Sequence, residues 1–159
     1  MNDAARFIDP AIIGELQLLS FNYASGVDRR DCDQLLSSFH PDATLTVPRA
    51  TEVAGKPPVT LRGHVEIGRI TERIAIYAQT FHFIGQSSFA PTDVGASGEI
   101  YCVAHHRWRD EVELDHVMYI RYHDMYRLGT DDHWRIATRA LQVDWTETKV
   151  VDVPGKTAR

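Results

Sequence analysis

The stretch FNYASGVDRRDCD, residues 21–33, contains an aspartate that helix formation does not explain. Asp31, followed by Gln34 three residues later, predicts the N-cap of a helix, so capping needs no second acid. Asp28 instead ends an apolar stripe, and an ionised carboxylate there is costly unless another group pairs with it. We therefore expect Asp28 to have a partner elsewhere in the chain. The stripe has helical spacing and consists of Ile12, Leu16, Leu19, Tyr23 and Val27.

The composition is that of one soluble globular domain. The chain has 159 residues, which is enough to bury a hydrophobic core. We predict a single domain over residues 1–159. The net charge of −5 gives no support for a nucleic-acid-binding surface. No stretch approaches the ~20 apolar residues of a membrane span, and no signal pattern opens the chain. The two cysteines, Cys32 and Cys102, are far apart, so we expect a reduced, cytoplasmic protein without nucleic-acid or membrane partners.

The predicted order of elements is helices first and long strands last. Asp9 and Pro10 predict a helix start, as N-cap and first helical residue. The order is typical of an α+β domain, here a cone-shaped curved antiparallel sheet wrapped on three N-terminal helices, with a cavity for a small ligand. We expect helices near 10–27, 32–39 and 63–79, strands near 43–47, 80–90, 98–109, 111–129 and 134–148, a loop at 48–61 that could cover the cavity, a folded core at about 9–147 and a mobile tail at 150–159.

His82 is the candidate partner for Asp28. Strand alternation puts His82 and Ile84 on one face, and Phe81 and Phe83 on the other. A histidine inside a core strand needs a hydrogen-bond partner, which could be a backbone carbonyl or the Asp28 carboxylate. The carboxylate would orient the ring, fix its tautomer and give a general base near neutral pH. The residues alone leave both arrangements open.

Two later strands carry further polar side chains. His105 and His106 are adjacent, so they point to opposite faces, and alternation does not say which face is the cavity. Arg121 and His123 share one face of the next strand. Taken one at a time, each of these residues is better explained as a solvated or subunit-contacting side chain. The sequence has no His-x-x-x-His, Cys-x-x-Cys, phosphate-loop or dinucleotide motif, so we expect no metal, no cofactor and acid–base chemistry.

Several short motifs together resemble the SnoaL-like branch of the nuclear-transport-factor-2-like superfamily, over roughly residues 9–147. The pattern is most similar to that of scytalone dehydratase. The resemblance implies a cone-shaped α+β barrel, often trimeric, whose catalytic Asp–His pair falls on Asp28 and His82. The motifs are Tyr23-x-x-x-x-Asp28-x-x-Asp31-x-Asp33, Phe39-x-Pro41-Asp42-Ala43, Phe81-His82-Phe83-Ile84-Gly85 and Trp134-Arg135-Ile136, with Arg139 and Asp144-Trp145.

The resemblance also implies roles for other residues. It puts a second catalytic histidine on His105, and Tyr23 matches a tyrosine of bile-acid 7α-dehydratase. Val27 stands where scytalone dehydratase has a tyrosine, so the pair is kept while the groups that bind the substrate carbonyl differ. The pocket is expected to include Val27, Val47, Arg121, His123 and Trp145.

The expected function is that of a cofactor-independent lyase on a small apolar substrate that is cyclic or polyketide-like. His82 would remove a proton and water would leave with help from His105 or Tyr23, and isomerisation or cyclisation by the same base is a near variant. The alternative class is a non-catalytic small-molecule binding module or the small subunit of a ring-hydroxylating oxygenase. We expect a homo-oligomer, with a trimer favoured over a dimer.

Overall fold

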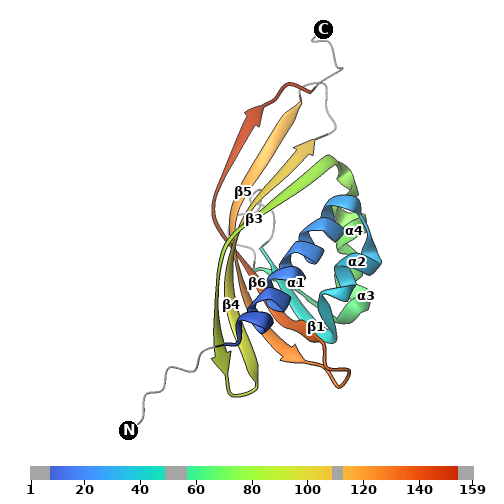
Figure 1. The fold of residues 1–159 in the computed structure, drawn as a ribbon. Coiled ribbons are helices and arrows are strands. Elements are labelled where there is room, and N and C mark those ends of the chain that lie inside the picture. The colour runs from blue at the N-terminus through green and yellow to red at the C-terminus, as the bar shows by residue number, and fades with distance from the viewer. Residues whose placement is uncertain (1–7, 49–56, 109–112, 154–159) are drawn as a thin grey trace.

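The computed structural model describes residues 8–48, 57–108 and 113–153, in which helices lie along one face of a curved sheet (Figure 1). The predicted α+β class and curved sheet are confirmed. The sheet is mixed and unclosed, with strand order β2-β1-β6-β5-β4-β3, because β1 runs parallel to β6 while all other neighbours are antiparallel. The elements are α1 (Pro10–Arg29), α2 (Cys32–Ser37), β1 (Phe39–Val47), β2 (Val59–Arg62), α3 (Gly63–Gly68), α4 (Ile70–Arg73), the 3-10 turn η1 (Ile74–Ile76), β3 (Tyr77–Thr92), β4 (Gly95–Trp108), β5 (Leu114–Leu128) and β6 (Trp134–Val150).

Both predicted helix starts are present. The Asp9 side chain accepts a hydrogen bond from the Ala11 N–H at 2.8 Å, and the Asp31 side chain accepts one from the Gln34 N–H at 2.9 Å. Between them α1 ends on Arg30, which adopts the left-handed conformation with φ 58°. This geometry closes the helix and sends the chain directly into α2. Asp28 therefore lies in the last turn of α1.

The prediction of one helix over residues 63–79 is wrong. Residues 63–79 form α3, α4 and η1 in succession, and β3 already begins at Tyr77. Short helical segments, and not one long helix, account for the apolar spacing, and they still bury Ile67 and Ile70. Tyr77 instead packs on the sheet, its ring centroid 4.7 Å from that of Trp108. The helical spacing therefore predicted which residues of this segment are buried, but it did not predict that the helix is interrupted.

The predicted loop and the predicted tail have different bounds in the structure. The end of the expected loop 48–61, from Val59, forms with Arg62 the strand β2, which pairs with β1, while residues 49–56 lie outside the described part. β6 continues to Val150, so the expected tail begins later, and residues 154–159 are again outside the described part. No helix among the described residues combines the length and apolarity needed to cross a membrane.

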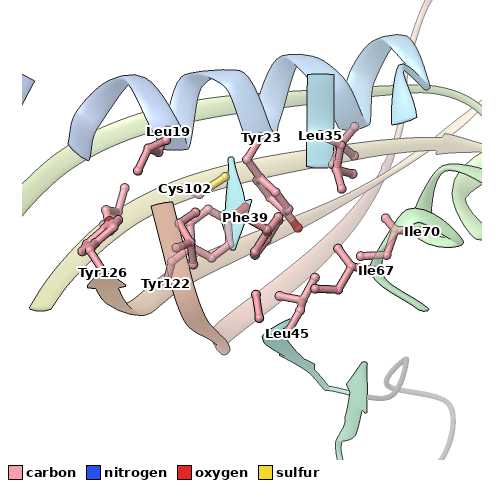
Figure 2. Packing of buried hydrophobic residues seen from close by; sticks show 14 of the residues in the cluster. Leu19, Tyr23, Leu35, Phe39, Leu45, Ile67, Ile70, Cys102, Tyr122 and Tyr126 are labelled. Atoms are coloured by element: carbon pink, nitrogen blue, oxygen red, sulfur yellow. The ribbon is translucent and has the colours of Figure 1, made fainter. Parts of the chain in front are cut away.

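The core fills the space between the helices and the sheet face that they cover. Figure 2 shows Leu19 and Tyr23 of α1 near Cys102, Tyr122 and Tyr126 of the sheet. Residues of β4 that belong to this core, such as Cys102 and Ala104, define the helix-covered face. Because side chains alternate along a strand, the residues between them belong to the open face.

Candidate functional site

Asp28 and His82 are in direct contact through two hydrogen bonds. Oδ1 of Asp28 lies 2.7 Å from Nδ1 of His82, and Oδ2 accepts the backbone N–H of His82 at 2.8 Å. β3 is an edge strand, so among the described residues no strand pairs with the outer side of its backbone. The carboxylate occupies part of that edge. Both groups are largely buried, with exposed side-chain fractions of 21% for Asp28 and 6% for His82.

This contact sets the pKa of Asp28 and determines which nitrogen of His82 remains available for proton exchange. Burial raises the pKa of Asp28, but the hydrogen bonds and charge of His82 outweigh burial and hold that pKa below its ordinary value. Asp28 is therefore ionised at neutral pH. With Nδ1 hydrogen-bonded to a carboxylate, Nε2 of His82 is the nitrogen left to exchange a proton with another molecule.

Arg30 ties the end of α1 to the start of β3. Its guanidinium donates to the backbone carbonyl of Tyr77 at 3.0 Å and to that of Asp28 at 3.3 Å. Gly26 allows the close approach of α2, since a Cβ added there would lie 2.5 Å from the backbone nitrogen of Leu35. Local packing therefore sets the position of the last turn of α1, and with it the Asp28 carboxylate.

His106 is the second histidine beside this pair. In register it faces Thr80, two residues before His82, and the ring centroids of His82 and His106 lie 5.7 Å apart. Burial, with a smaller effect from the charge of His82, lowers the pKa of His106 to about 4. His106 is therefore neutral at pH 7. Its Nδ1 is buried and has no hydrogen-bond partner within the described residues.

An open groove gives access to the Asp28–His82 pair. It follows the outer edge of β3 beside α1, where residues from both faces of β3 line it, and has a volume of about 560 Å³, within the range of small-molecule sites. Phe21 of α1 and Phe81 and Phe83 of β3 line it together with Asp28 and His82. All three phenylalanines are roughly half exposed or more. The groove thus combines apolar walls with one acid–base pair.

Tyr23 lies in a buried polar cluster deeper in the core. The guanidinium of Arg139 lies between two aromatic rings, 4.5 Å from the centroid of Tyr23 and 4.4 Å from that of Tyr122. Arg139 also forms two hydrogen bonds to Asp124, at 2.6 and 2.8 Å, and one to Ser20 at 3.0 Å. Burial raises the pKa of Tyr23 to about 12, so this phenol is protonated at neutral pH.

The other predicted site residues do not join the Asp28–His82 pair. His105 lies on the open face, where its Nδ1 is 2.7 Å from Oδ2 of Asp115. Arg121 and His123 share this face, with Arg121 paired to Asp144 by two hydrogen bonds of 2.8 Å. Trp145 stacks there on Tyr119. Val27 is buried in the core, and Val47 packs at its margin.

Sequence reasoning left His106 without a role because it could not choose between the two faces of β4. The usable signal is the run of small and apolar residues Ile100, Cys102 and Ala104, which alternates in phase with His106. Among the described residues, no group of three or more His, Cys, Asp or Glu side chains is arranged to hold a metal ion.

Comparison with known proteins agrees with this architecture. A family model described as a SnoaL-like domain matches residues 12–140. Comparison with curated proteins gives no match. A hexachlorocyclohexane dehydrochlorinase, LinA type 2, has a similar structure, with TM-score 0.77 and 16% identity over 92% of this chain and 96% of that one.

Two further solved structures share the fold. A protein from Novosphingobium aromaticivorans, provisionally assigned as a scytalone dehydratase, aligns with TM-score 0.71 and 17% identity over 92% of this chain and 95% of that one. ActVI-ORFA from Streptomyces coelicolor aligns with TM-score 0.65 and 15% identity over 84% of this chain and 98% of that one. At these identities the similarity shows the fold alone.

Proposed function

This chain belongs to the SnoaL-like domain family, as the order of its motifs predicted, and on that premise we propose that it is a cofactor-independent lyase. The reaction is a dehydratase-type elimination on a cyclic or polyketide-like small molecule. One observation carries the proposal: the Asp28 carboxylate bonds both the backbone N–H and Nδ1 of His82. A histidine held in this way has a fixed tautomer and a basic Nε2, as a general base requires.

The proposed step begins with proton removal by Nε2 of His82 from a carbon next to an activating carbonyl. The electron pair of that C–H bond forms the new double bond, and the C–O bond to the leaving hydroxyl breaks. Protonated His82 returns its proton to the departing oxygen, so the product is water and the base is restored. Asp28 stays ionised and stabilises the transient imidazolium.

His106 is assigned the polarising role in this step. A neutral imidazole can donate a hydrogen bond to the carbonyl oxygen as negative charge develops there, and the low pKa of His106 keeps it neutral. His105 is given no step because it lies on the open face. Tyr23 is also given no step. It is protonated, packs against the guanidinium of Arg139 and lies in the protein interior.

The substrate class rests on the groove and on the similar structures. Three phenylalanines favour a flat, largely apolar molecule, and a groove of about 560 Å³ suits one of a few fused rings. Two of the similar structures carry the names of a scytalone dehydratase and a dehydrochlorinase, and both names describe eliminations. These names support elimination over other uses of the same base.

The test is turnover of cyclic β-hydroxy ketones, followed as the absorbance of the conjugated product appears. Asp28→Asn and His82→Gln should each lower kcat by about 10²–10⁴-fold, the usual contribution of a general base, while the melting temperature stays close to that of the wild type. Asp31→Asn is the matched control, because asparagine caps a helix as well as aspartate does. Full turnover by Asp28→Asn would overturn the mechanism.

The same assay separates the alternatives. An isomerase or cyclase using this base would lose activity in the same variants but release no water. A non-catalytic binding module, or an oxygenase small subunit, would bind the ketone unchanged, and Asp28→Asn would alter its affinity at most.

A further inference from the structure

Arg29 brings a positive charge into the groove that contains the Asp28–His82 pair. It lies in the last turn of α1 and lines the groove. Among the described residues that line the groove, Asp28 and Arg29 carry a formal charge. Both carboxylate oxygens of Asp28 are already hydrogen-bonded to His82. The charge of Arg29 is therefore not neutralised by the acid beside it in the sequence.

The Arg29 side chain is exposed and forms no ion pair or hydrogen bond with the part of the chain that the structure describes. Other partly exposed arginines of this protein do form such pairs. Arg121 is paired with Asp144, and Arg135 with Asp131. The guanidinium of Arg29 thus keeps all its donors available to a molecule in the groove.

Three contacts show that α1 runs antiparallel to β3 along the groove. Each joins a residue of the helix or its C-cap to a residue of the strand, and the strand numbers fall as the helix numbers rise. In order they are Gln17 to Ser87 at 3.1 Å, Asp28 to His82 at 2.7 Å and Arg30 to the Tyr77 carbonyl at 3.0 Å. The position of a residue along α1 therefore gives its position along the groove.

The groove has an apolar end and a charged end. Phe21 lies between the first two contacts, beside the part of β3 that includes Phe83 and Ile84. Arg29 lies between the last two contacts, at the end lined by Gln79. His82 lies between these ends. A molecule with an apolar body and one anionic group would fill the groove with its reacting carbon near His82.

We infer that the substrate of this groove is a ring compound that carries a carboxylate, and that Arg29 binds the carboxylate. The inference rests on the proposed function for the groove and narrows its substrate class. The planar guanidinium matches a carboxylate with two parallel hydrogen bonds, and its charge strengthens both. The protein as a whole carries a net charge of −5, so an anionic substrate needs a local cation of this kind.

Arg73 separates binding of the substrate from a role at a helix end. A cation in the last turn of a helix interacts favourably with the helix dipole, which alone would account for an arginine at position 29. Arg73 is also an exposed arginine in the last turn of a helix, α4, but it does not line the groove. Arg73→Gln is therefore the matched control for Arg29→Gln.

The test is the binding of 2-naphthoate and of 2-naphthamide, measured by isothermal titration calorimetry. The two probes have the same rings and nearly the same shape, but only the first is charged. Arg29→Gln should weaken binding of 2-naphthoate by about tenfold, the effect of losing a charge-assisted hydrogen bond. Its affinity for 2-naphthamide and that of Arg73→Gln for both probes should equal the wild-type values.

Salt and lysine give two further readouts that a purely structural role would not change. Raising the NaCl concentration from about 0.05 to 0.5 M should weaken binding of 2-naphthoate to the wild type but not to Arg29→Gln, because the site is open to solvent. Arg29→Lys should bind 2-naphthoate with intermediate affinity, since lysine keeps the charge but lacks the planar pair of donors.

This inference and the proposed function can fail separately, because binding is measured without turnover. Wild-type affinity of Arg29→Gln for 2-naphthoate would overturn the inference, even in a protein that dehydrates neutral ketones. An equal loss in Arg73→Gln, an equal loss for 2-naphthamide, or no preference of the wild type for 2-naphthoate would overturn it as well. Selective loss of 2-naphthoate binding would support the inference, even in a protein that turns over no ketone.

Discussion

His105 and His106 are adjacent in the sequence but belong to two different environments on opposite faces of the sheet. The His106 ring lies 5.7 Å from that of His82, whereas His105 is hydrogen-bonded to Asp115 at 2.7 Å. Two neighbouring residues of one type therefore offer a direct comparison of the two faces.

His106→Phe should lower kcat by about 10²–10³-fold, the usual effect of losing one donor to a developing oxyanion, since phenylalanine fills the space but cannot donate a hydrogen bond. His105→Gln should leave kcat unchanged, because His105 lies on the open face of the sheet, away from His82. Steady-state kinetics on the same ketone measure both. The opposite ranking of the two variants would return the catalytic role to His105.

His106 should also make stability depend on pH. Its folded pKa is about 4 against an ordinary value of 6.5, so between these values the unfolded chain binds a proton that the folded chain does not. Stability should therefore fall as pH decreases from 6.5 to 4, by about 3 kcal/mol at most, because one pKa unit corresponds to about 1.4 kcal/mol. Urea denaturation at a series of pH values measures this slope.

His106→Phe should flatten the stability curve in that window only. The depressed pKa of Asp28 acts at lower pH, because its contribution is lost as pH falls below the ordinary value of 3.8 and through the folded pKa. A curve unchanged by His106→Phe would show that His106 is not buried in its neutral form.

Two glycines of α1 should respond oppositely to alanine. At Gly26 a Cβ would meet the backbone of Leu35 at 2.5 Å, so Gly26→Ala should destabilise the fold and displace Asp28, lowering kcat as well. At Gly14 nothing lies within 4 Å of the added Cβ, so Gly14→Ala should stabilise the helix by about 0.5–1 kcal/mol. Thermal denaturation and kcat, measured on both variants, test the pair; equal effects would contradict the close contact.

The buried ion pair between Arg139 and Asp124 should be costly to break from one side. Both side chains are fully buried, so Arg139→Met should leave Asp124 uncompensated and cost about 3–5 kcal/mol of folding free energy. Adding Asp124→Leu should recover much of that loss. Denaturant unfolding of the single and double variants gives the comparison, and strictly additive losses would show that the two charges do not stabilise each other.

Local signals in the sequence predicted the features near Asp28 well. The helix starts at Asp9 and Asp31 depend on residues two or three positions away, and both caps are present. The contact of Asp28 with His82 was within reach because an unexplained buried acid and a strand histidine each needed a partner. The catalytic use of that contact remains a proposal.

Which residue of β4 lies opposite His82 could not be predicted from local signals, because it depends on a bulge in β3. From the turn, Thr92 pairs with Gly95, and continuing that register unbroken would bring His82 opposite His105. The irregularity between Ile84 and Ser87 shifts the pairing by one residue, so His82 faces Ala104. A shift of one residue exchanges the two faces of a strand. Nothing in the alternation pattern alone marks that position.

The position of β6 bears on how the chain folds. β6 lies between β1 and β5, and it joins β1 in parallel by pairing Ile136 with Phe39. Until residues 134–150 have been synthesised, the β1–β2 hairpin has no strand that links it to β3–β5. Closing such a long loop is entropically unfavourable, and distant pairings slow folding. The nascent protein thus completes its sheet with its last strand, which also brings Arg139 to Asp124 and to Ser20 of the first helix.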